Sequence, residues 1–126
     1  MSADDRLRPH PHERLSAPAQ RIDLAQAARD LRGEAHPAVD GHRQIVVARE
    51  GPVSVVLFAF EQGAALKEHR APGSITIHAL AGHLRVTAGE TIHDLPAGSL
   101  LALAAGVAHD VLALDRSDML LTVART

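Results

Sequence analysis

The chain of 126 residues has no cysteine, tryptophan or tyrosine, and Phe58 and Phe60 are its only phenylalanines. Without cysteine, disulfides, thiolate metal sites and cysteine nucleophiles are all excluded. With two aromatic rings, base stacking on a sheet surface is not expected. The apolar fraction is nevertheless 46%, so we expect an aliphatic core of leucine, valine, isoleucine and alanine.

Clustered positive charge is also lacking. The chain has 13 basic and 15 acidic side chains, and Lys67 is its only lysine. Nothing forms the basic face that a nucleic-acid backbone demands. No apolar run approaches the roughly 18 residues of a membrane span, and the N-terminus is charged where a secretory peptide is apolar. We therefore expect a soluble cytoplasmic protein that binds neither nucleic acid nor membrane.

The length suits one domain of ordinary size, and the sequence pattern divides it into three parts. Residues 1–21 are rich in proline, arginine, histidine and aspartate, which predicts a flexible N-terminal arm. Residues 22–42 predict a short helix and a connecting loop, with Asp23 as N-cap and Gly33 after the last turn. The remaining part, residues 43–126, changes to a strand pattern.

Short apolar segments between glycine and proline turns predict nine strands in this last part. Their expected ranges are 43–49, 53–60, 65–69, 74–80, 83–87, 91–95, 100–103, 109–114 and 118–124. The segment 53–60 is apolar at odd and even positions, as expected of a central strand covered on both faces. Strands at such close and even spacing favour an antiparallel double-sheet barrel.

Two glycine-to-histidine stretches stand out, GAALKEHRAPGSITIHALAG at 63–82 and GSLLALAAGVAH at 98–109. They resemble the paired motifs of the cupin superfamily, written G-x5-H-x-H-x(3,4)-E-x6-G and G-x5-P-x-G-x2-H-x3-N. The matching residues are Gly63, His69, Gly82, Gly98, Gly106 and His109. The resemblance covers about residues 43–124 and implies a small single-domain cupin. Its fold would be all-β, a double-stranded β-helix or jelly-roll cupin barrel with one short N-terminal helix.

The metal-binding part of these motifs is degenerate. Metal-binding cupins use two histidines and a glutamate from the first motif and one histidine from the second. This chain has Ala71 in place of the second histidine and Ile75 in place of the glutamate. The resemblance thus leaves His69 and His109 as metal ligands.

The content of this reduced site stays open. Neutral imidazoles suit one divalent ion of Zn, Ni, Fe or Cu, but two protein ligands rarely hold such an ion tightly. The alternatives are a loosely occupied or vestigial site and two barrel histidines that bind nothing.

Alternation along strands predicts which side chains surround the pair. It places Lys67 on the face of His69, and Val111 on the face of His109. On the matched strand it turns Ile75 and Ile77 inward. The expected ligand-binding residues are Lys67, His69, Ile75, Ile77, His109 and Val111. His78 and His93 are expected to face outward, so that either becomes a third ligand only where the alternation fails.

Three functions fit this pattern, and the sequence names no substrate. The first is a barrel that binds a small molecule in its mouth around His69 and His109, with a weakly held divalent metal or none. The alternative is a metal-dependent cupin enzyme, of oxygenase or isomerase type, that uses the reduced two-histidine site. The third is a structural or partner-binding dimer. We expect a homodimer, because the apolar strand 53–60 and the barrel edges need covering.

Overall fold

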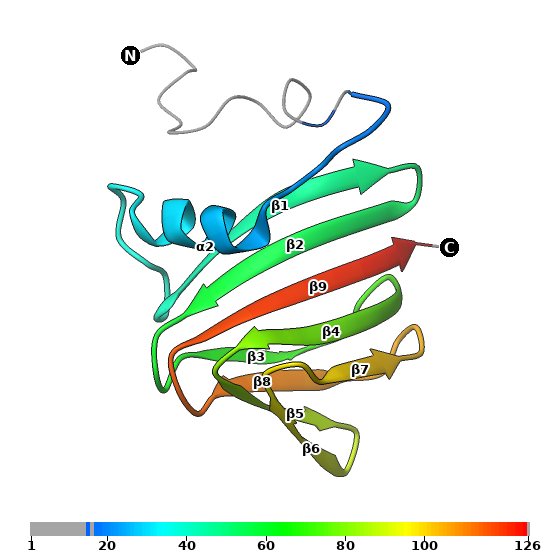
Figure 1. Ribbon diagram of the computed structural model, residues 1–126. Helices are drawn as coiled ribbons and strands as arrows, with labels where there is room; N and C mark the ends of the chain where they lie inside the picture. Colours follow the sequence, from blue (N-terminus) through cyan, green and yellow to red (C-terminus); the bar gives the residue numbers. More distant parts are fainter. Residues whose placement is uncertain (1–14, 16, 126) are drawn as a thin grey trace.

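Two antiparallel β-sheets dominate the computed structural model, which describes residues 15 and 17–125 (Figure 1). A single helix, α2 (Leu24–Arg32), precedes the strands in this described part. The strands are β1 (His42–Glu50), β2 (Val53–Phe60), β3 (Ala65–His69), β4 (Gly73–Ala81), β5 (His83–Ala88), β6 (Thr91–Pro96), β7 (Leu100–Leu103), β8 (His109–Ala113) and β9 (Ser117–Arg125). Among the described residues, no helix is long and apolar enough to cross a lipid bilayer.

The strand order is that of a jelly roll. The five-stranded sheet has the order β1-β2-β9-β4-β7, and the four-stranded sheet has the order β3-β8-β5-β6. Neighbours within a sheet are often distant in sequence, as for β2 beside β9 and β3 beside β8. The predicted all-β barrel with one short helix is confirmed, and each strand boundary lies within one residue of the predicted one.

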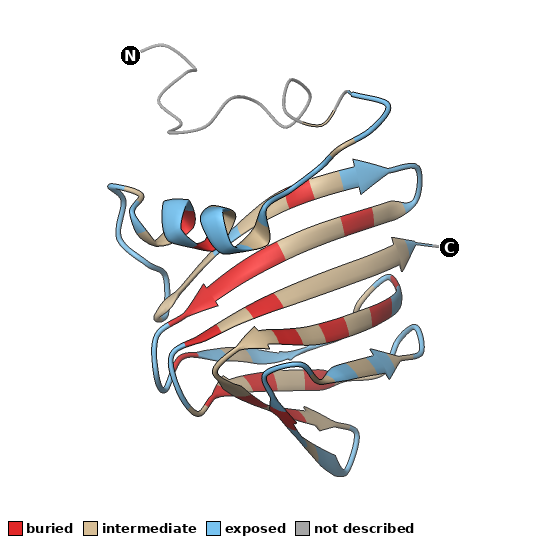
Figure 2. Ribbon diagram, viewed as in Figure 1, coloured by how far each residue is buried: buried red, intermediate tan, exposed pale blue. Residues whose placement is uncertain are grey.

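Strand β2 shows why the sequence is apolar at both parities there. Phe58 and Phe60 face the core between the sheets, and their rings stack with centroids 5.8 Å apart. Leu57 and Ala59 face the other way and pack beneath the helix. Along β4, by contrast, buried residues alternate with more exposed ones (Figure 2).

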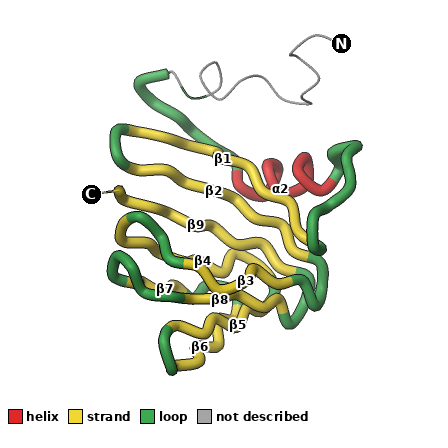
Figure 3. Tube along the Cα trace, turned by 180° about the vertical axis from the view of Figure 1, so that it is seen from behind, coloured by secondary structure: helices red, strands yellow, loops and turns green. Residues whose placement is uncertain are grey.

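Helix α2 begins where Asp23 accepts a hydrogen bond from the Gln26 backbone N–H at 3.1 Å. It ends at Gly33, whose N–H donates to the Arg29 carbonyl. Its buried residues Ala28 and Leu31 pack against β1 and β2. The view from behind shows helix α2 beside these two strands (Figure 3). This part of the five-stranded sheet therefore has the second sheet on one face and the helix on the other.

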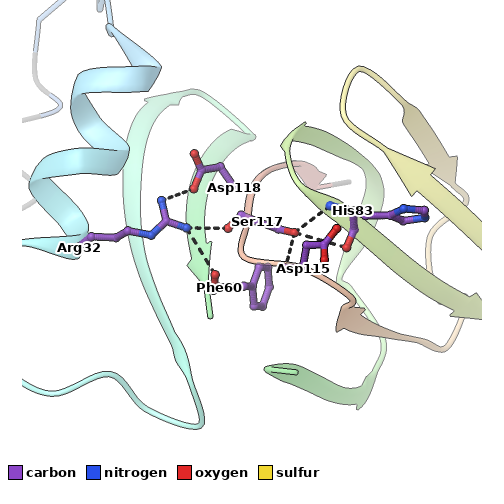
Figure 4. A network of polar contacts seen from close by, with 6 residues as sticks. All are labelled: Arg32, Phe60, His83, Asp115, Ser117 and Asp118. Atoms are coloured by element: carbon purple, nitrogen blue, oxygen red, sulfur yellow. Dashed lines mark hydrogen bonds and ion pairs between the residues drawn. The ribbon is translucent and has the colours of Figure 1, made fainter. Parts of the chain in front are cut away.

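A polar network lies at one end of the barrel, where β2 ends and β5 and β9 begin (Figure 4). The guanidinium of Arg32 lies 2.5 Å from the carboxylate of Asp118 and donates to the carbonyls of Ser117 and Phe60. The Ser117 hydroxyl accepts from the His83 N–H at 3.0 Å and donates to the Asp115 carbonyl at 2.8 Å. The network ties the helix, β9 and the β4–β5 turn together.

The predicted arm lies largely outside the described residues, since residues 1–14 and 16 do not belong to them. Within the described part, the side-chain amide of Gln20 pairs with the backbone of Arg49 on β1. It accepts from the Arg49 N–H and donates to the Arg49 carbonyl, both at 3.0 Å. This pairing satisfies both backbone polar groups of one residue on an edge strand. The three-part division of the chain stays a prediction.

Candidate functional site

The two candidate histidines lie at the end of the barrel opposite the Ser117 network. Strand β3 ends at His69, and the loop after it leads into β4. The β7–β8 loop leads into His109, the first residue of β8. Arg70 joins the two loops, because its Nη1 donates to the Gly106 carbonyl at 2.6 Å.

His69 and His109 are direct partners in the β3–β8 ladder. Their ring centroids are 4.3 Å apart, and the ring planes are tilted by 58°. His109 is 2% exposed, whereas His69 is open to solvent. One ring of the pair therefore lies in the barrel core, and the other lies at the protein surface.

Both rings are held in the same way by the backbone. Nδ1 of His69 lies 2.9 Å from the Lys67 carbonyl, and Nδ1 of His109 lies 3.0 Å from the Val107 carbonyl. A carbonyl only accepts, so each Nδ1 carries the hydrogen and each neutral ring keeps a lone pair on Nε2. Metal-ligating histidines are typically oriented by such a hydrogen bond from the other ring nitrogen.

A β-bulge changes the face of Lys67. The ladder register shifts between Leu66 and His69, so that β3 has one residue more than β8 over this interval. Leu66 packs against the core and His69 contacts His109, whereas Lys67 is exposed. The prediction that Lys67 shares the face of His69 is therefore wrong. Lys67 reaches the site through its backbone carbonyl.

The three predicted aliphatic neighbours do face inward. Ile75, Ile77 and Val111 are 3%, 1% and 2% exposed and belong to the core between the sheets. Ile75 occupies the position where the cupin motif has its glutamate, and half-buried Ala71 packs against the same core. That any of them contacts a ligand stays a prediction.

His93 faces the interior, contrary to the predicted outward orientation. It pairs with Val86, which is fully buried, and Leu95 two residues later is 5% exposed. The neighbouring Ile92 is 63% exposed although it is apolar, so the apolar residues of β6 do not by themselves indicate its inward side. No group of three or more His, Cys, Asp or Glu side chains within the described ranges is placed to hold a metal ion. His93 therefore does not complete a three-ligand centre.

Ser54 is a polar residue whose role the sequence does not reveal. It lies on β2 opposite Val123 of β9, which in turn pairs with Ile75. Ser54 therefore lies at the histidine end of the five-stranded sheet. It shares a face of β2 with Val56, two residues later, which packs on the core. Its side chain is 3% exposed and its hydroxyl has no hydrogen-bond partner. Only the sheet register shows that it faces inward.

Three grooves along the described residues lie away from the histidine pair. One of about 270 Å³ lies between Gln20 and the β1–β2 hairpin, and one of about 300 Å³ lies at the start of β1. The third, of about 350 Å³, lies over β4, β7 and β9. None of the three is lined by His69 or His109.

No protein-family model and no curated protein matches the chain. Solved structures do match. A cupin superfamily protein from Desulfitobacterium hafniense DCB-2 superposes with a TM-score of 0.69 at 18% identity, over 90% of this chain and 96% of its own. The chain has the cupin fold.

Two further solved structures also match this chain. A conserved protein of unknown function from Streptococcus pyogenes has a TM-score of 0.68 at 20% identity, over 86% of this chain and 89% of its own. The salicylate 1,2-dioxygenase of Pseudoaminobacter salicylatoxidans has a TM-score of 0.66 at 16% identity, over 80% of this chain and 30% of the enzyme. At these identities the likeness concerns the cupin fold alone.

Proposed function

We propose that this cupin barrel binds a small molecule at its histidine end, anchored by His69 and His109. One observation carries the proposal. Both Nδ1 atoms are occupied by backbone carbonyls, and within the described part of the chain neither Nε2 atom has a hydrogen-bond partner. Two adjacent imidazoles thus each offer an unused lone pair on Nε2.

The chemistry of the pair limits what it can bind. Two Nε2 acceptors suit a molecule with N–H or O–H donors, or a divalent ion that prefers nitrogen ligands. Ile75 and Val111 are aliphatic neighbours on the inner faces, so the rest of the molecule would meet an apolar surface. Ligand sites commonly combine such a surface with a few fixed polar atoms.

The residues fit a loosely held metal ion better than a tightly held one. His69 and His109 would bind Zn²⁺, Ni²⁺, Fe²⁺ or Cu²⁺ through Nε2. Ala71 and Ile75, at the positions of the other cupin ligands, offer no donor atom. Because catalytic zinc sites normally have three protein ligands, the ion here depends on water or on the bound molecule for its remaining ligands.

A metal-dependent enzyme of oxygenase or isomerase type is the second candidate. The hydrogen bonds from both Nδ1 atoms to carbonyls favour it, because they orient the rings and raise the basicity of Nε2. In such an enzyme the ion would supply Lewis acidity to a bound substrate oxygen. The role of the chain would be to hold the ion at His69 and His109 beside the apolar surface.

A thermal-shift screen of small molecules, with and without Zn²⁺ and Ni²⁺, tests the binding site. Wild type, His69→Ala and His109→Ala are compared with His78→Ala, whose side chain lies on the outer face of β4. We expect ligands that raise the melting temperature of wild type and His78→Ala and have no effect on the other two variants. Ligands that act equally on all four proteins would place the site elsewhere.

Metal analysis of untagged protein separates the two candidates. The enzyme requires an ion that survives purification and is lost in His69→Ala. A content below about a tenth of an ion per chain, without stabilisation by added ions, counts against the enzyme and leaves the binding barrel.

We also propose that the protein is a homodimer. Strand β7 ends the five-stranded sheet within the described residues, and Leu100 at its start is 61% exposed. Sheet edges and exposed apolar side chains favour association. Sedimentation equilibrium should give the mass of two chains, and the mass of one chain at high protein concentration would contradict the dimer.

A further inference from the structure

The outer face of the five-stranded sheet, which is turned away from the second sheet, is covered only in part. Helix α2 packs against β1 and β2. Of the other strands, only Leu80 on β4 and Leu120 on β9 reach the apolar cluster of the helix among the described residues. Figure 1 shows the helix beside β1 and β2 and away from β4 and β7. The described part of the structure therefore leaves most of the outer face of β9, β4 and β7 open.

The sheet register shows which side chains lie on this open face. The core residues of β4 face the second sheet, so the residues between them face outward. Thr76 of β4 pairs with Thr122 of β9 and with Ala102 of β7, so that these three side chains form one row across the strands. In the neighbouring row, His78 pairs with Leu100 of β7. The open face thus consists mainly of small, hydroxyl and aliphatic side chains.

Charged side chains are scarce on this face, in contrast to the outside of the other sheet. Within β4, β7 and β9 the charged residues are Asp118 and Arg125. Asp118 forms the ion pair with Arg32, and Arg125 ends β9 on the parity of the core-facing residues. The outer face of the four-stranded sheet instead carries Arg85 and Asp94, which form an ion pair at 3.2 Å. The two outer faces therefore suit different surroundings.

The open face has both a hollow and a projection. A groove of about 350 Å³ lies over β4, β7 and β9, and small side chains line much of it, among them Ser74, Ala102, Thr122 and Ala124. Leu100 lies two residues before Ala102 on β7, about 7 Å along the strand, and is 61% exposed. A surface that carries both parts can complement a second copy of itself.

We propose that two copies of the chain associate through this face, sheet on sheet about a two-fold axis, with Leu100 of each copy in the groove of the other. The inference rests on the homodimer proposed above and adds the surface that forms it. In a two-fold interface the same patch of both copies meets, so an axis between Leu100 and the groove places each leucine over the partner's groove.

The chemistry of the face favours a second copy as its occupant. The groove and Leu100 carry no carboxylate, arginine or lysine, so the contact buries no unpaired charge and opposes no like charges. A partner recognised through charge would find nothing to pair with in the groove. The small side chains allow the close approach of about 10 Å at which two sheets pack face to face.

Sedimentation equilibrium of the full chain over a range of concentrations tests this surface. Ala102→Arg places a charge in the groove. Ala65→Arg is the matched control, because Ala65 is an exposed alanine on β3, which ends the other sheet. We expect wild type and Ala65→Arg to form equally stable dimers. The dissociation constant of Ala102→Arg should rise about tenfold or more, because two like charges would be buried across the axis.

Cysteine cross-linking tests the same surface with a much smaller change. The chain has no cysteine, so Ala102→Cys and Ala65→Cys each carry a single thiol. Ala102 lies between Leu100 and the rest of the groove, close to the proposed axis. A short bismaleimide should therefore join two copies of Ala102→Cys and leave Ala65→Cys unlinked. This pair keeps the test valid if circular dichroism shows that Ala102→Arg is not folded.

The outcomes separate this surface from the dimer itself. Equal dissociation constants of wild type and folded Ala102→Arg, or no cross-linking of Ala102→Cys, overturn the inference and assign the dimer to another surface. A wild type that stays monomeric at high concentration overturns the dimer and this surface together. Ligand binding at His69 and His109 is measured independently by thermal shift.

Discussion

His69 stands directly opposite His109 on neighbouring strands, with ring centroids 4.3 Å apart, yet His109 is buried and His69 is exposed. The two rings share one backbone arrangement, in which Nδ1 donates to the carbonyl two residues earlier. The two side chains thus make the same backbone hydrogen bond but differ in burial. Replacing the exposed His69 should therefore affect ligand binding more than stability, whereas replacing the buried His109 should affect both.

His109→Ala should lower the free energy of unfolding by about 2–4 kcal/mol, because it leaves a cavity in a packed core. His69→Ala should cost less than about 1 kcal/mol, since its ring is open to solvent. Urea denaturation of both variants measures the difference. Equal losses would show that His69 is packed as tightly as His109.

The two buried serines should respond in opposite ways to alanine. Ser54 has a buried hydroxyl without a partner, so Ser54→Ala should leave stability unchanged or raise it by about 1 kcal/mol. Ser117 bonds to His83 and Asp115, so Ser117→Ala should cost about 1–3 kcal/mol. A clear loss of stability in Ser54→Ala would mean that an ordered water or a bound molecule satisfies its hydroxyl.

Gly82→Ala should be among the most damaging single changes in the chain. The backbone φ is +81°, and a Cβ would lie 2.3 Å from both the Arg116 carbonyl and the Ser117 hydroxyl. We expect a loss of about 3 kcal/mol or more, from strain and from a broken network. Gly89→Ala is the control, because its φ is +60° with open space around it, and it should lose about 1 kcal/mol. Thermal unfolding of the two variants tests whether the close approach at Gly82, rather than its φ alone, governs stability.

Arg32→Gln should loosen helix α2 from the barrel. The change removes the ion pair with Asp118 and the bonds to two carbonyls, all at partly buried positions. We expect a loss of about 2 kcal/mol, and hydrogen exchange should become faster in residues 24–32. Arg29→Gln, an exposed arginine of the same helix, should change stability by less than about 0.5 kcal/mol. If both variants behave alike, the Arg32 network contributes little.

The strand pattern and the glycines were sufficient for the fold. Short apolar segments between turns can bury their side chains only as sheets, and the two glycine-to-histidine stretches indicated which barrel forms. The pairing of His69 with His109 was foreseen on the same grounds. The structure places the two rings in contact.

The faces of Lys67 and His93 were decided by register, which the sequence does not carry. One extra residue in β3 reverses the alternation of side chains after Leu66. In β6 the apolar Ile92 is exposed, so the apolar residues do not indicate which side of this strand faces inward. Ser54 became notable only when the structure showed that its hydroxyl is buried without a partner. The sequence by itself thus determined the strands and turns of the barrel, because residue spacing and type are local properties of the chain. The tertiary structure decided which polar atoms remain without partners, because that depends on contacts between strands far apart in the chain.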